Sequence, residues 1–299
     1  MNGKNGNTEL DVHNVYKSFG GIQALNGVSF SVRGNELIGL IGPNGAGKTT
    51  LTNVLDGMYK PTSGEVRLNG RRIDGLPPYE VARRGLGRTF QVTRAFRRMT
   101  VLENMLVPAM ALHPTARQRD FHAKAMEVLE FLTIEHLAND YARSLSGGQQ
   151  KLLELGRLLM LDPAIIILDE PFAGVHPKLM ETIYDYIMTV HEQGKAFIII
   201  SHDMDSIFTL SKRLLVLNYG DLIADGDPAE VKEDPVVIEA YLGEEEEEGP
   251  AVIPAGRLAE GLALDEPGLS KSKGAQGPAR PVPSAAEGSE ARGEEEANA

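Results

Sequence analysis

The sequence predicts an α/β fold with a mainly parallel core sheet. In residues 1–243, short apolar runs alternate with longer stretches of helical periodicity, which is the pattern of strands joined by helices. Three of the runs, at residues 165–169, 197–201 and 214–218, are nearly continuous Ile, Leu and Val, as in central parallel strands that are covered on both faces. Residues 101–161 contain no convincing strand, so we expect helices there.

The remaining strands are expected where shorter apolar runs follow the polar N-terminus. The complete set of expected strands is residues 10–15, 28–32, 37–41, 165–169, 197–201 and 214–218. Gly220 and Gly226 bracket a final hairpin-like piece. The folded body then spans residues 8–243, with a helical subdomain at about residues 92–161.

The composition changes abruptly at residue 244. The chain has 299 residues with 42 acidic and 30 basic side chains, and residues 244–299 alone hold thirteen acidic and five basic ones. This segment begins with five consecutive Glu and continues with six Pro among Gly, Ala and Ser. It buries too little apolar surface to offset the entropy of ordering. We expect an acidic disordered tail, either a solvated extension or a docking segment.

Composition also excludes several classes of protein. With no Cys, the chain has no disulfide framework, no thiolate metal site and no Cys nucleophile. The longest purely apolar runs, residues 164–168 and 196–200, are far shorter than the roughly 18 residues of a membrane-spanning helix. The first ten residues are polar and lack the apolar core of a signal peptide. We therefore expect a protein that stays in the cytosol.

A glycine-rich segment follows the expected strand at residues 37–41. It reads Gly42-Pro-Asn-Gly-Ala-Gly-Lys-Thr49 and matches the strand, G-x-x-x-x-G-K-[ST], helix pattern of a P-loop. Backbone N–H groups of such a loop turn inward on phosphate oxygens, the lysine adds a positive charge and the threonine offers a hydroxyl to Mg²⁺. A fortuitous Gly-rich turn is the alternative, but both flanking elements are present. We expect a nucleoside triphosphate with Mg²⁺, bound by Asn44, Gly45, Ala46, Gly47, Lys48, Thr49 and Thr50.

Two carboxylates stand at the end of the expected strand at residues 165–169. Asp169 closes a run of three Ile and one Leu, and Glu170 follows it. A lone Asp in this place is usually only a strand terminus, but a phosphate-bound Mg²⁺ needs a carboxylate in its shell, directly or through water. We therefore expect Asp169 to serve the metal. Glu170 is placed to orient and deprotonate an attacking water, which contributes roughly 10² to 10⁴ in rate.

The segment Leu145-Ser-Gly-Gly-Gln149 narrows the class of nucleotide-binding protein. Ser146 suits an N-cap with Gln149 as its capping-box partner, and the two glycines leave the helix N-terminus bare for a phosphate. A well-capped helix start is the plain alternative. We place Ser146, Gly147, Gly148 and Gln149 among the nucleotide-contacting residues.

With this segment, the sequence resembles the nucleotide-binding subunits of ABC transporters across residues 10–243. The motifs occur in the family order: Gln91 stands 43 residues after Lys48, Leu145 stands 97 after Lys48, Asp169 lies 20 after Gln149, and His202 lies 32 after Glu170. The resemblance implies a P-loop NTPase of ABC ATPase type, with an N-terminal antiparallel β part and an inserted helical subdomain. It makes residues 8–243 the ABC ATP-binding domain.

The resemblance also implies roles for single residues. Tyr16 would stack on adenine, an interaction of about 1 to 3 kcal/mol in other base-stacking proteins, although a surface aromatic at a strand end is the alternative. Gln91 would sense Mg²⁺ and the attacking water, and His202 would hydrogen-bond the γ-phosphate. The catalytic set would be Glu170, His202 and Gln91, and the metal set Thr49, Gln91 and Asp169.

In this family two chains close head to tail, so that the signature segment at residues 145–149 of one chain covers the triphosphate on the P-loop of the other. The implied partner is a second ABC ATPase, either the same chain or a paralogue. One position departs from the family pattern. His176 stands where most ABC ATPases have Asp, and others often Asn, a few residues after the catalytic Glu.

A finer resemblance covers residues 88–105, 150–155 and 234–243, which look like the ATPases of branched-chain amino acid importers and their urea or short-amide relatives. It implies ATP hydrolysis that powers uptake of a small polar solute, with integral-membrane permease subunits and, indirectly, a solute-binding protein as partners. The location would be the cytoplasmic, inner face of the cell membrane, and we expect no nucleic acid.

Two other functions are less well supported by the sequence. ABC ATPases that act on DNA carry a long coiled coil between P-loop and signature, and those that act on ribosomes carry two cassettes, whereas this chain has a 97-residue gap and one set of motifs. A scaffold that binds nucleotide without turnover is disfavoured by the presence of Glu170 and His202.

A run of arginines precedes and follows Gln91. Between Glu80 and Glu103 the chain has six Arg, at positions 83, 84, 88, 94, 97 and 98, and no acidic residue. Nucleic acid, anionic lipid headgroups or a merely solvated face would each suit such a patch. We favour a surface for the membrane subunit, with Phe96 and Met99 as apolar anchors.

Overall fold

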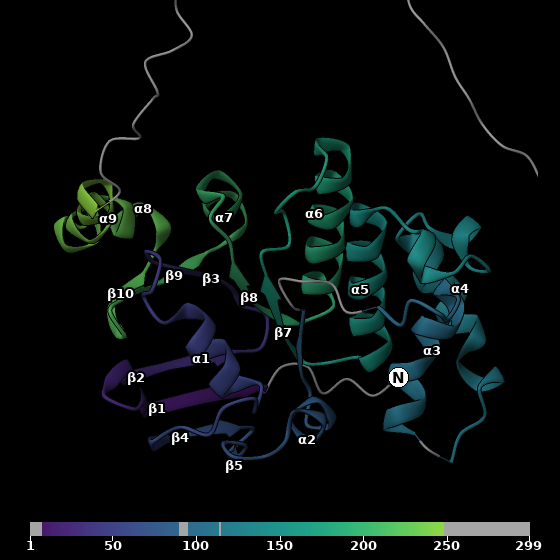
Figure 1. The fold of residues 1–299 in the computed structure, drawn as a ribbon, viewed down its shortest axis with the longest axis horizontal. Helices are drawn as coiled ribbons and strands as arrows, with labels where there is room; N and C mark the ends of the chain where they lie inside the picture. Colours follow the sequence, from purple (N-terminus) through teal and green to yellow (C-terminus); the bar gives the residue numbers. More distant parts are fainter. Residues whose placement is uncertain (1–7, 90–94, 114, 248–299) are drawn as a thin grey trace, which may run out of the picture. The chain divides into compact units, whose positions relative to one another are not determined.

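Two β-sheets form the framework of the molecule (Figure 1). The computed structural model describes residues 8–89, 95–113 and 115–247. The first sheet is antiparallel, in the order β2-β1-β4-β5, and consists of β1 (Glu9–Phe19), β2 (Ile22–Arg33), β4 (Ser63–Leu68) and β5 (Arg71–Arg72). The second runs β10-β9-β3-β8-β7-β6 and consists of β3 (Leu37–Ile41), β6 (Leu86–Arg88), β7 (Ile165–Asp169), β8 (Ala196–Ile200), β9 (Arg213–Asn218) and β10 (Asp221–Gly226).

The second sheet is parallel except at one edge. β3, β6, β7, β8 and β9 run in one direction, and β10 folds back on β9 as an antiparallel hairpin. Tyr219 and Gly220 make the turn of this hairpin, both at positive φ. The hairpin-like piece predicted between Gly220 and Gly226 is only the second strand, β10, of a hairpin that begins with β9.

The helices fall into a group around the sheets and a group at one end of the body (Figure 1). The first group is α1 (Lys48–Leu55), α2 (Pro78–Arg83), α6 (Pro177–Glu192), α7 (Met204–Leu210), α8 (Pro228–Glu233) and α9 (Pro235–Glu247). The second is α3 (Val101–Leu112), α4 (Arg119–Phe131) and α5 (Gly147–Leu161), joined by the short 3₁₀ turns Glu135–Leu137 and Ala142–Ser144. Within the described residues, no helix is both long and apolar enough to pass through a bilayer.

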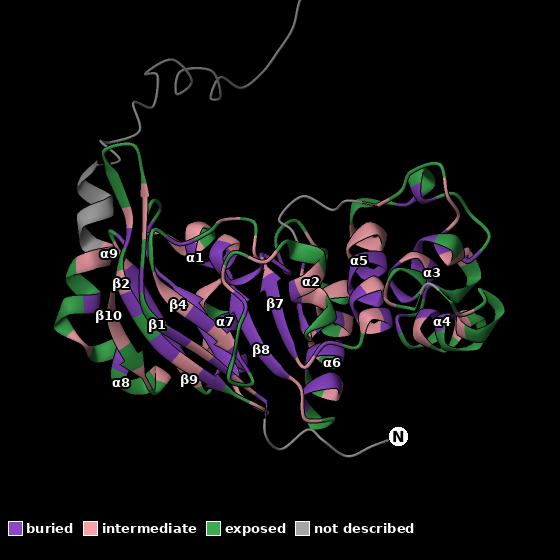
Figure 2. Ribbon diagram, turned by 90° about the horizontal axis from the view of Figure 1, so that it is seen from below, coloured by how far each residue is buried: buried purple, intermediate pink, exposed green. Residues whose placement is uncertain are grey.

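Alternate residues of the parallel strands enter two separate apolar clusters. In β3, Leu37 and Ile41 pack with residues of the α3–α6 helices, whereas Ile38 and Leu40 pack with α1 and the antiparallel sheet. Because successive strand side chains point to opposite faces, the sheet is buried on both of them, as the purple strands β7 and β8 in Figure 2 show. Burial of both faces explains why these strands are nearly continuous apolar runs in the sequence.

Most predicted strands are confirmed, with different ends. β3 and β7 have the predicted bounds, and β1, β2 and β9 contain the predicted residues but are longer. The strand predicted at 197–201 is wrong by one residue at each end, because Ala196 pairs with Ile165 of β7. Ser201 instead accepts a hydrogen bond from the Asp203 N–H through its hydroxyl at 3.0 Å. Strands β4, β5 and β6 were not predicted.

The predicted helical subdomain and tail agree with the structure only in part. Residues 101–161 hold α3, α4 and α5 and, where they are described, no strand. The predicted start of the subdomain near residue 92 lies outside the described residues. Helix α9 continues through Glu247, so residues 244–247 are helical rather than part of a disordered tail, consistent with the high helix propensity of Glu. The rest of the predicted tail lies outside the described residues.

A buried amide fixes the loop that leads into α3. Asn104 has no exposed surface, and its side chain accepts a hydrogen bond from the Phe96 N–H and donates to the carbonyls of Phe96 and Thr100 at 2.8 to 3.1 Å. Each of these buried polar groups would cost about 1–3 kcal/mol if left without a partner. The loop that carries Phe96 and the two following arginines is therefore rigidly attached to the helical group.

Candidate functional site

The predicted site residues converge on the carboxyl end of the parallel sheet. β3, β8, β7 and β6 are neighbours in that order, with Leu40 beside Ile200, Ile200 beside Asp169, and Ile167 beside Arg88. The segments that follow these four strands therefore start at one edge of the sheet. The P-loop follows β3 and His202 follows β8. Glu170 follows β7, and Thr89 follows β6.

The P-loop presents an open backbone cradle. Gly47, with φ 105°, has no room for a side chain, because a Cβ there would lie 2.7 Å from the carbonyl oxygen of Ala24. A Cβ at Gly45, with φ 77°, would have no atom within 4 Å, so the loop is open at this point. Helix α1 begins at Lys48 without a side-chain cap. Its first N–H groups, including those of Thr49 and Thr50, therefore point toward the loop, where an anion would bind.

Lys48 lies back over the loop. Its ammonium donates to the carbonyl oxygens of Gly42 and, at 2.8 Å, of Pro43. Asn44 and Gly45 are exposed and Ala46 is buried beneath them. The loop thus combines a bare helix start, an open glycine and an adjacent cation, which together fit a phosphate group.

Asp169 is held by a buried arginine. Nη2 of Arg88 donates to Oδ2 of Asp169 at 2.8 Å, and Nη1 donates at 2.7 Å to Oδ2 of Asp56 and at 2.7 Å to Oδ1 of Asn53, both near the end of α1. The Arg88 side chain is only 5% exposed. The backbone N–H of Asp169 donates to the Thr89 hydroxyl at 3.0 Å. Asp169 is therefore bound through its backbone to Thr89, which follows β6, and through its side chain to Arg88, which also contacts α1.

The position of Arg88 corrects the predicted surface patch. Arg88 is not on the surface, because its guanidinium neutralises two carboxylates inside the body. Burial holds the pKa of Asp56 above its usual value, against the lowering effect of the Met58 N–H and of Arg88. Arg83 and Arg84 donate to the carbonyls of Ala111 and Arg72. Arg97 and Arg98 are exposed, and position 94 lies outside the described residues.

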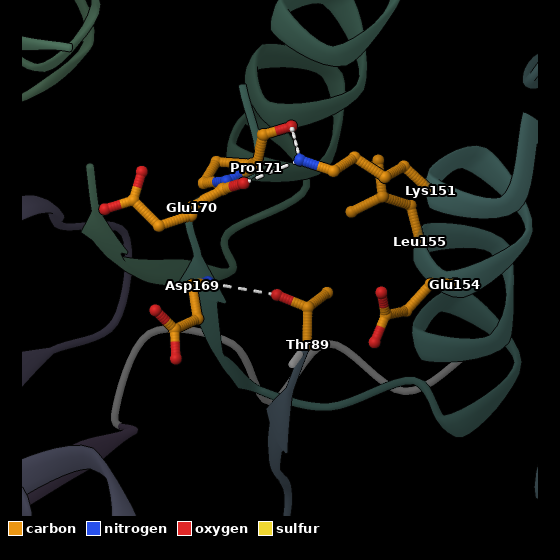
Figure 3. Close-up of a pocket in the computed structure, with 7 residues that line it drawn as sticks. All are labelled: Thr89, Lys151, Glu154, Leu155, Asp169, Glu170 and Pro171. Carbon is orange, nitrogen blue, oxygen red and sulfur yellow. Dashed lines mark hydrogen bonds between the residues drawn. The ribbon is translucent and has the colours of Figure 1, made fainter. Parts of the chain in front are cut away.

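Glu170 has a strained backbone and a carboxylate that faces away from α5 (Figure 3). Its φ is 51°, a left-handed conformation that costs a residue other than Gly about 1–3 kcal/mol and persists only where the surrounding structure imposes it. Oε2 accepts a hydrogen bond from the His202 N–H at 3.3 Å. Oε1 is buried, accepts no hydrogen bond from the described residues and lies 3.4 Å from Nε2 of His202. This oxygen is available to accept a proton from a bound water.

The signature segment forms the predicted capping box. The Ser146 hydroxyl accepts from the Gln149 N–H at 3.3 Å, and Oε1 of Gln149 accepts from the Ser146 N–H at 2.9 Å. A Cβ at Gly147 would have no atom within 4 Å, whereas Gly148 packs against Leu179 of α6. The helix start is therefore capped and anchored, with an open face at Gly147. In Figures 1 and 2, α5 and α1 lie on opposite sides of β7.

Of the three remaining residues that the sequence singled out, the structure describes Tyr16 and His176 but not Gln91. Tyr16 is on β1 with its hydroxyl against Gly27 of β2, the strand that also passes the P-loop at Ala24. His176 is the N-cap of α6, where its ring nitrogen accepts from the Lys178 N–H at 3.3 Å, so histidine performs the capping that Asp or Asn would perform. Gln91 lies outside the described residues.

A small pocket between α5 and the end of β7 contains residues that the sequence analysis did not identify (Figure 3). It is lined by Thr89, Lys151, Glu154, Leu155, Asp169, Glu170 and Pro171. Lys151 and Thr89 contact the backbone of the two predicted carboxylate residues. In the sequence, Lys151 lies two residues after Gln149 and Thr89 lies two residues before Gln91. This closeness to predicted site residues could have drawn attention to them, but only the fold shows which groups they contact.

We expect Arg88→Met to destabilise the protein by roughly 3–5 kcal/mol, because it leaves the buried carboxylates of Asp56 and Asp169 without their cation. Denaturant unfolding measures the change. Arg71→Met, at an exposed position, is the control and should alter the free energy of unfolding by no more than about 0.5 kcal/mol. Equal stability of the two variants would contradict this account of the network.

The chain matches two family models. One, described as ABC transporter, matches residues 25–173, and the other, described as branched-chain amino acid ATP-binding cassette transporter, matches residues 222–247. The chain is 40% identical over 249 residues to the high-affinity branched-chain amino acid transport ATP-binding protein BraF of Pseudomonas aeruginosa, covering 79% of this chain and 98% of BraF. It is 38% identical over 249 residues to the protein LivG of Escherichia coli K12, with the same coverage.

Solved structures give the same result. An ATP-binding cassette of an ABC transporter in its ADP conformation is similar with a TM-score of 0.70 and 38% identity, covering 79% of this chain and 99% of that one. A dimeric bacterial ABC transporter cassette is similar with a TM-score of 0.67 and 28% identity, covering 73% and 98%. The chain belongs to the ABC transporter family, as one of its nucleotide-binding ATPase subunits.

Proposed function

We propose that this chain hydrolyses ATP to power the uptake of branched-chain amino acids through a separate membrane permease. The single observation that carries the proposal is the convergence, at one sheet edge, of the open P-loop with the free carboxylate oxygen of Glu170. The names of its relatives BraF and LivG support the class of solute.

The nucleotide would bind along one face of the domain. Backbone N–H groups of Gly45, Gly47 and α1 would hold the phosphates, with Asn44, Ala46 and Lys48 beside them, and the Tyr16 ring would stack on adenine. The described residues contain no group of three or more His, Asp or Glu that could hold a metal by themselves. Mg²⁺ would therefore take most of its ligands from phosphates and water, with Thr49, Asp169 and Gln91 completing its surroundings, and would neutralise charge on the phosphates.

Hydrolysis would use the carboxylate of Glu170. Oε1 accepts a proton from the attacking water, the water oxygen bonds to the γ-phosphorus, and the bond to the β,γ-bridging oxygen breaks to release ADP. The His202 N–H fixes the carboxylate through Oε2, and the exposed His202 ring, whose side chain is 61% accessible, would hydrogen-bond the γ-phosphate. Arg88 and Thr89 keep Asp169 in place during this step.

The signature helix would serve a second ATPase subunit. Gly147 is open at the capped start of α5, and the similarity to a dimeric cassette supports a pair of such subunits. Ser146, Gly147, Gly148 and Gln149 would contact the triphosphate on the P-loop of the neighbour, either a second copy or a paralogue. Hydrolysis would then depend on pairing.

The loop before α3 would contact the permease. Phe96 is 45% exposed, with the Arg157 guanidinium 5.1 Å from its ring, and Arg97, Arg98 and Met99 follow it. Asn104 holds this loop on the helical group, so a motion of α3 to α5 would reach the permease directly. The complex would lie on the cytoplasmic face of the cell membrane, with a solute-binding protein on the other side and no nucleic acid partner.

Glu170→Gln should lower the rate of Mg²⁺-dependent ATP hydrolysis by roughly 10²- to 10⁴-fold, because glutamine cannot accept the proton of the attacking water. Affinity for ATP should be retained, since the P-loop is unchanged. Phosphate release and nucleotide binding by the full chain measure the two effects, and Glu130→Gln, at an exposed position of α4, is the control. Hydrolysis by Glu170→Gln at the parental rate would rule out Glu170 as the base.

Reversal of charge at both Arg97 and Arg98, to Glu, should weaken co-purification with the permease while ATP affinity stays the same, because both side chains are exposed on the loop beside Phe96. The matched control reverses Arg117 and Arg119, which are exposed near the start of α4. If the Arg97/Arg98 variant assembles as well as the control variant, the permease does not bind at this loop.

A further inference from the structure

Lys151 connects the signature helix to the backbone that carries Glu170 (Figure 3). It lies two residues after the capping box, and its ammonium donates to the carbonyl oxygens of Glu170 at 2.8 Å, Pro171 at 3.3 Å and Ala173 at 2.6 Å. An ammonium has three N–H donors and no acceptor. The three carbonyls therefore match the donors of this lysine.

The backbone that Lys151 contacts is the strained one. Glu170 has a φ of 51°, and such a conformation persists only where the surroundings impose it. Two backbone hydrogen bonds already restrain this residue: its N–H donates to the Ile200 carbonyl at 2.9 Å, and its carbonyl accepts from the Ala173 N–H at 3.3 Å. Lys151 binds the same Glu170 carbonyl from the side of α5 and also binds the two carbonyls of Pro171 and Ala173 that follow it.

The geometry separates the two ends of Glu170. Figure 3 shows the carbonyl oxygen pointing to Lys151 and the carboxylate pointing away from it. The contact of Lys151 with Glu170 is therefore through the backbone carbonyl, and the carboxylate oxygens stay available. Partial burial lowers the pKa of Lys151, and in this less polar surrounding charge-assisted hydrogen bonds are stronger than in water.

We propose that Lys151 is a positioning residue that holds the backbone of Glu170 in its hydrolytic conformation. The inference rests on the proposed role of Glu170 as the base. It has a consequence for pairing: the start of α5 would face the nucleotide of the neighbouring subunit, while Lys151 on the same helix fixes the base for the chain's own nucleotide. A displacement of α5 would thus change both sites together.

Lys151→Met keeps much of the length of the side chain and removes the donors. We expect its kcat for ATP hydrolysis by the full chain to fall roughly 10- to 100-fold, because small misplacements of a reacting group have effects of this size. The KM for ATP should stay within about twofold, since no ground-state contact to nucleotide is removed. Lys151→Arg should recover most of the rate because it retains charged donors, and Lys124→Met, at an exposed position of α4, should match the parent.

The decisive measurement combines Lys151→Met with Glu170→Gln under single-turnover conditions. If Lys151 acts through Glu170, the double variant should hydrolyse ATP within about twofold of Glu170→Gln alone, as expected for residues that act as a unit. If Lys151→Met slows the Glu170→Gln chain as much as it slows the parent, the lysine has only a general structural role and the proposal is wrong. Lys151→Leu, which also removes the donors, replaces Lys151→Met in the same comparison if the latter does not fold.

The two proposals fail in different ways. A Glu170→Gln chain as fast as the parent would remove the proposed base and, with it, the reason for the inference. A slow Glu170→Gln chain together with a Lys151→Met chain at the parental rate would leave the proposed function intact and overturn only the role of Lys151.

Discussion

The parallel pairing of β3, β8, β7 and β6 is the constraint on which the rest of the structure depends. Strands that run in one direction end at one edge, so the P-loop, His202, Glu170 and Thr89 start side by side although they are far apart in the sequence. Apolar side chains that alternate into two clusters fix the register of these strands. A slip of one residue would move the buried side chains to the wrong face and misplace Asp169 as well.

Two cations secure the two carboxylate residues from different directions. Arg88 binds the side chain of Asp169 and connects it to α1, whereas Lys151 binds the backbone of Glu170 and connects it to α5. The contact at Glu170 is with its backbone and not with its side chain. A cation paired with the Glu170 carboxylate would weaken it as a base. Under the proposed function, each chain would hold one phosphate cradle with its base at the sheet edge, and the separate capped start of α5 would serve the neighbouring subunit.

The sequence predicted the parts of this arrangement that local patterns determine. β3 and β7 were found with the right bounds because each is a continuous buried run, and the capping box because Ser146 and Gln149 have the required spacing. β6 escaped notice because it is short and contains Gly87 and Arg88. Arg88 was assigned to a surface patch since a count of charges does not distinguish a buried ion pair from an exposed one. Lys151 and Asn104 act on backbone groups, which a sequence pattern does not reveal.

The central claim is that the start of α5 completes the nucleotide site of the neighbouring subunit, and crosslinking tests it most directly. The chain has no Cys, so in a pair of two copies Gly147→Cys in one copy and Asn44→Cys in the other would be the only thiols. Where the neighbour is a paralogue, the second cysteine is placed in its P-loop. In the Glu170→Gln background, a short bifunctional thiol reagent should join the two subunits when ATP and Mg²⁺ are present and not when nucleotide is absent. Failure to crosslink with bound ATP, or equal crosslinking without it, would contradict the account.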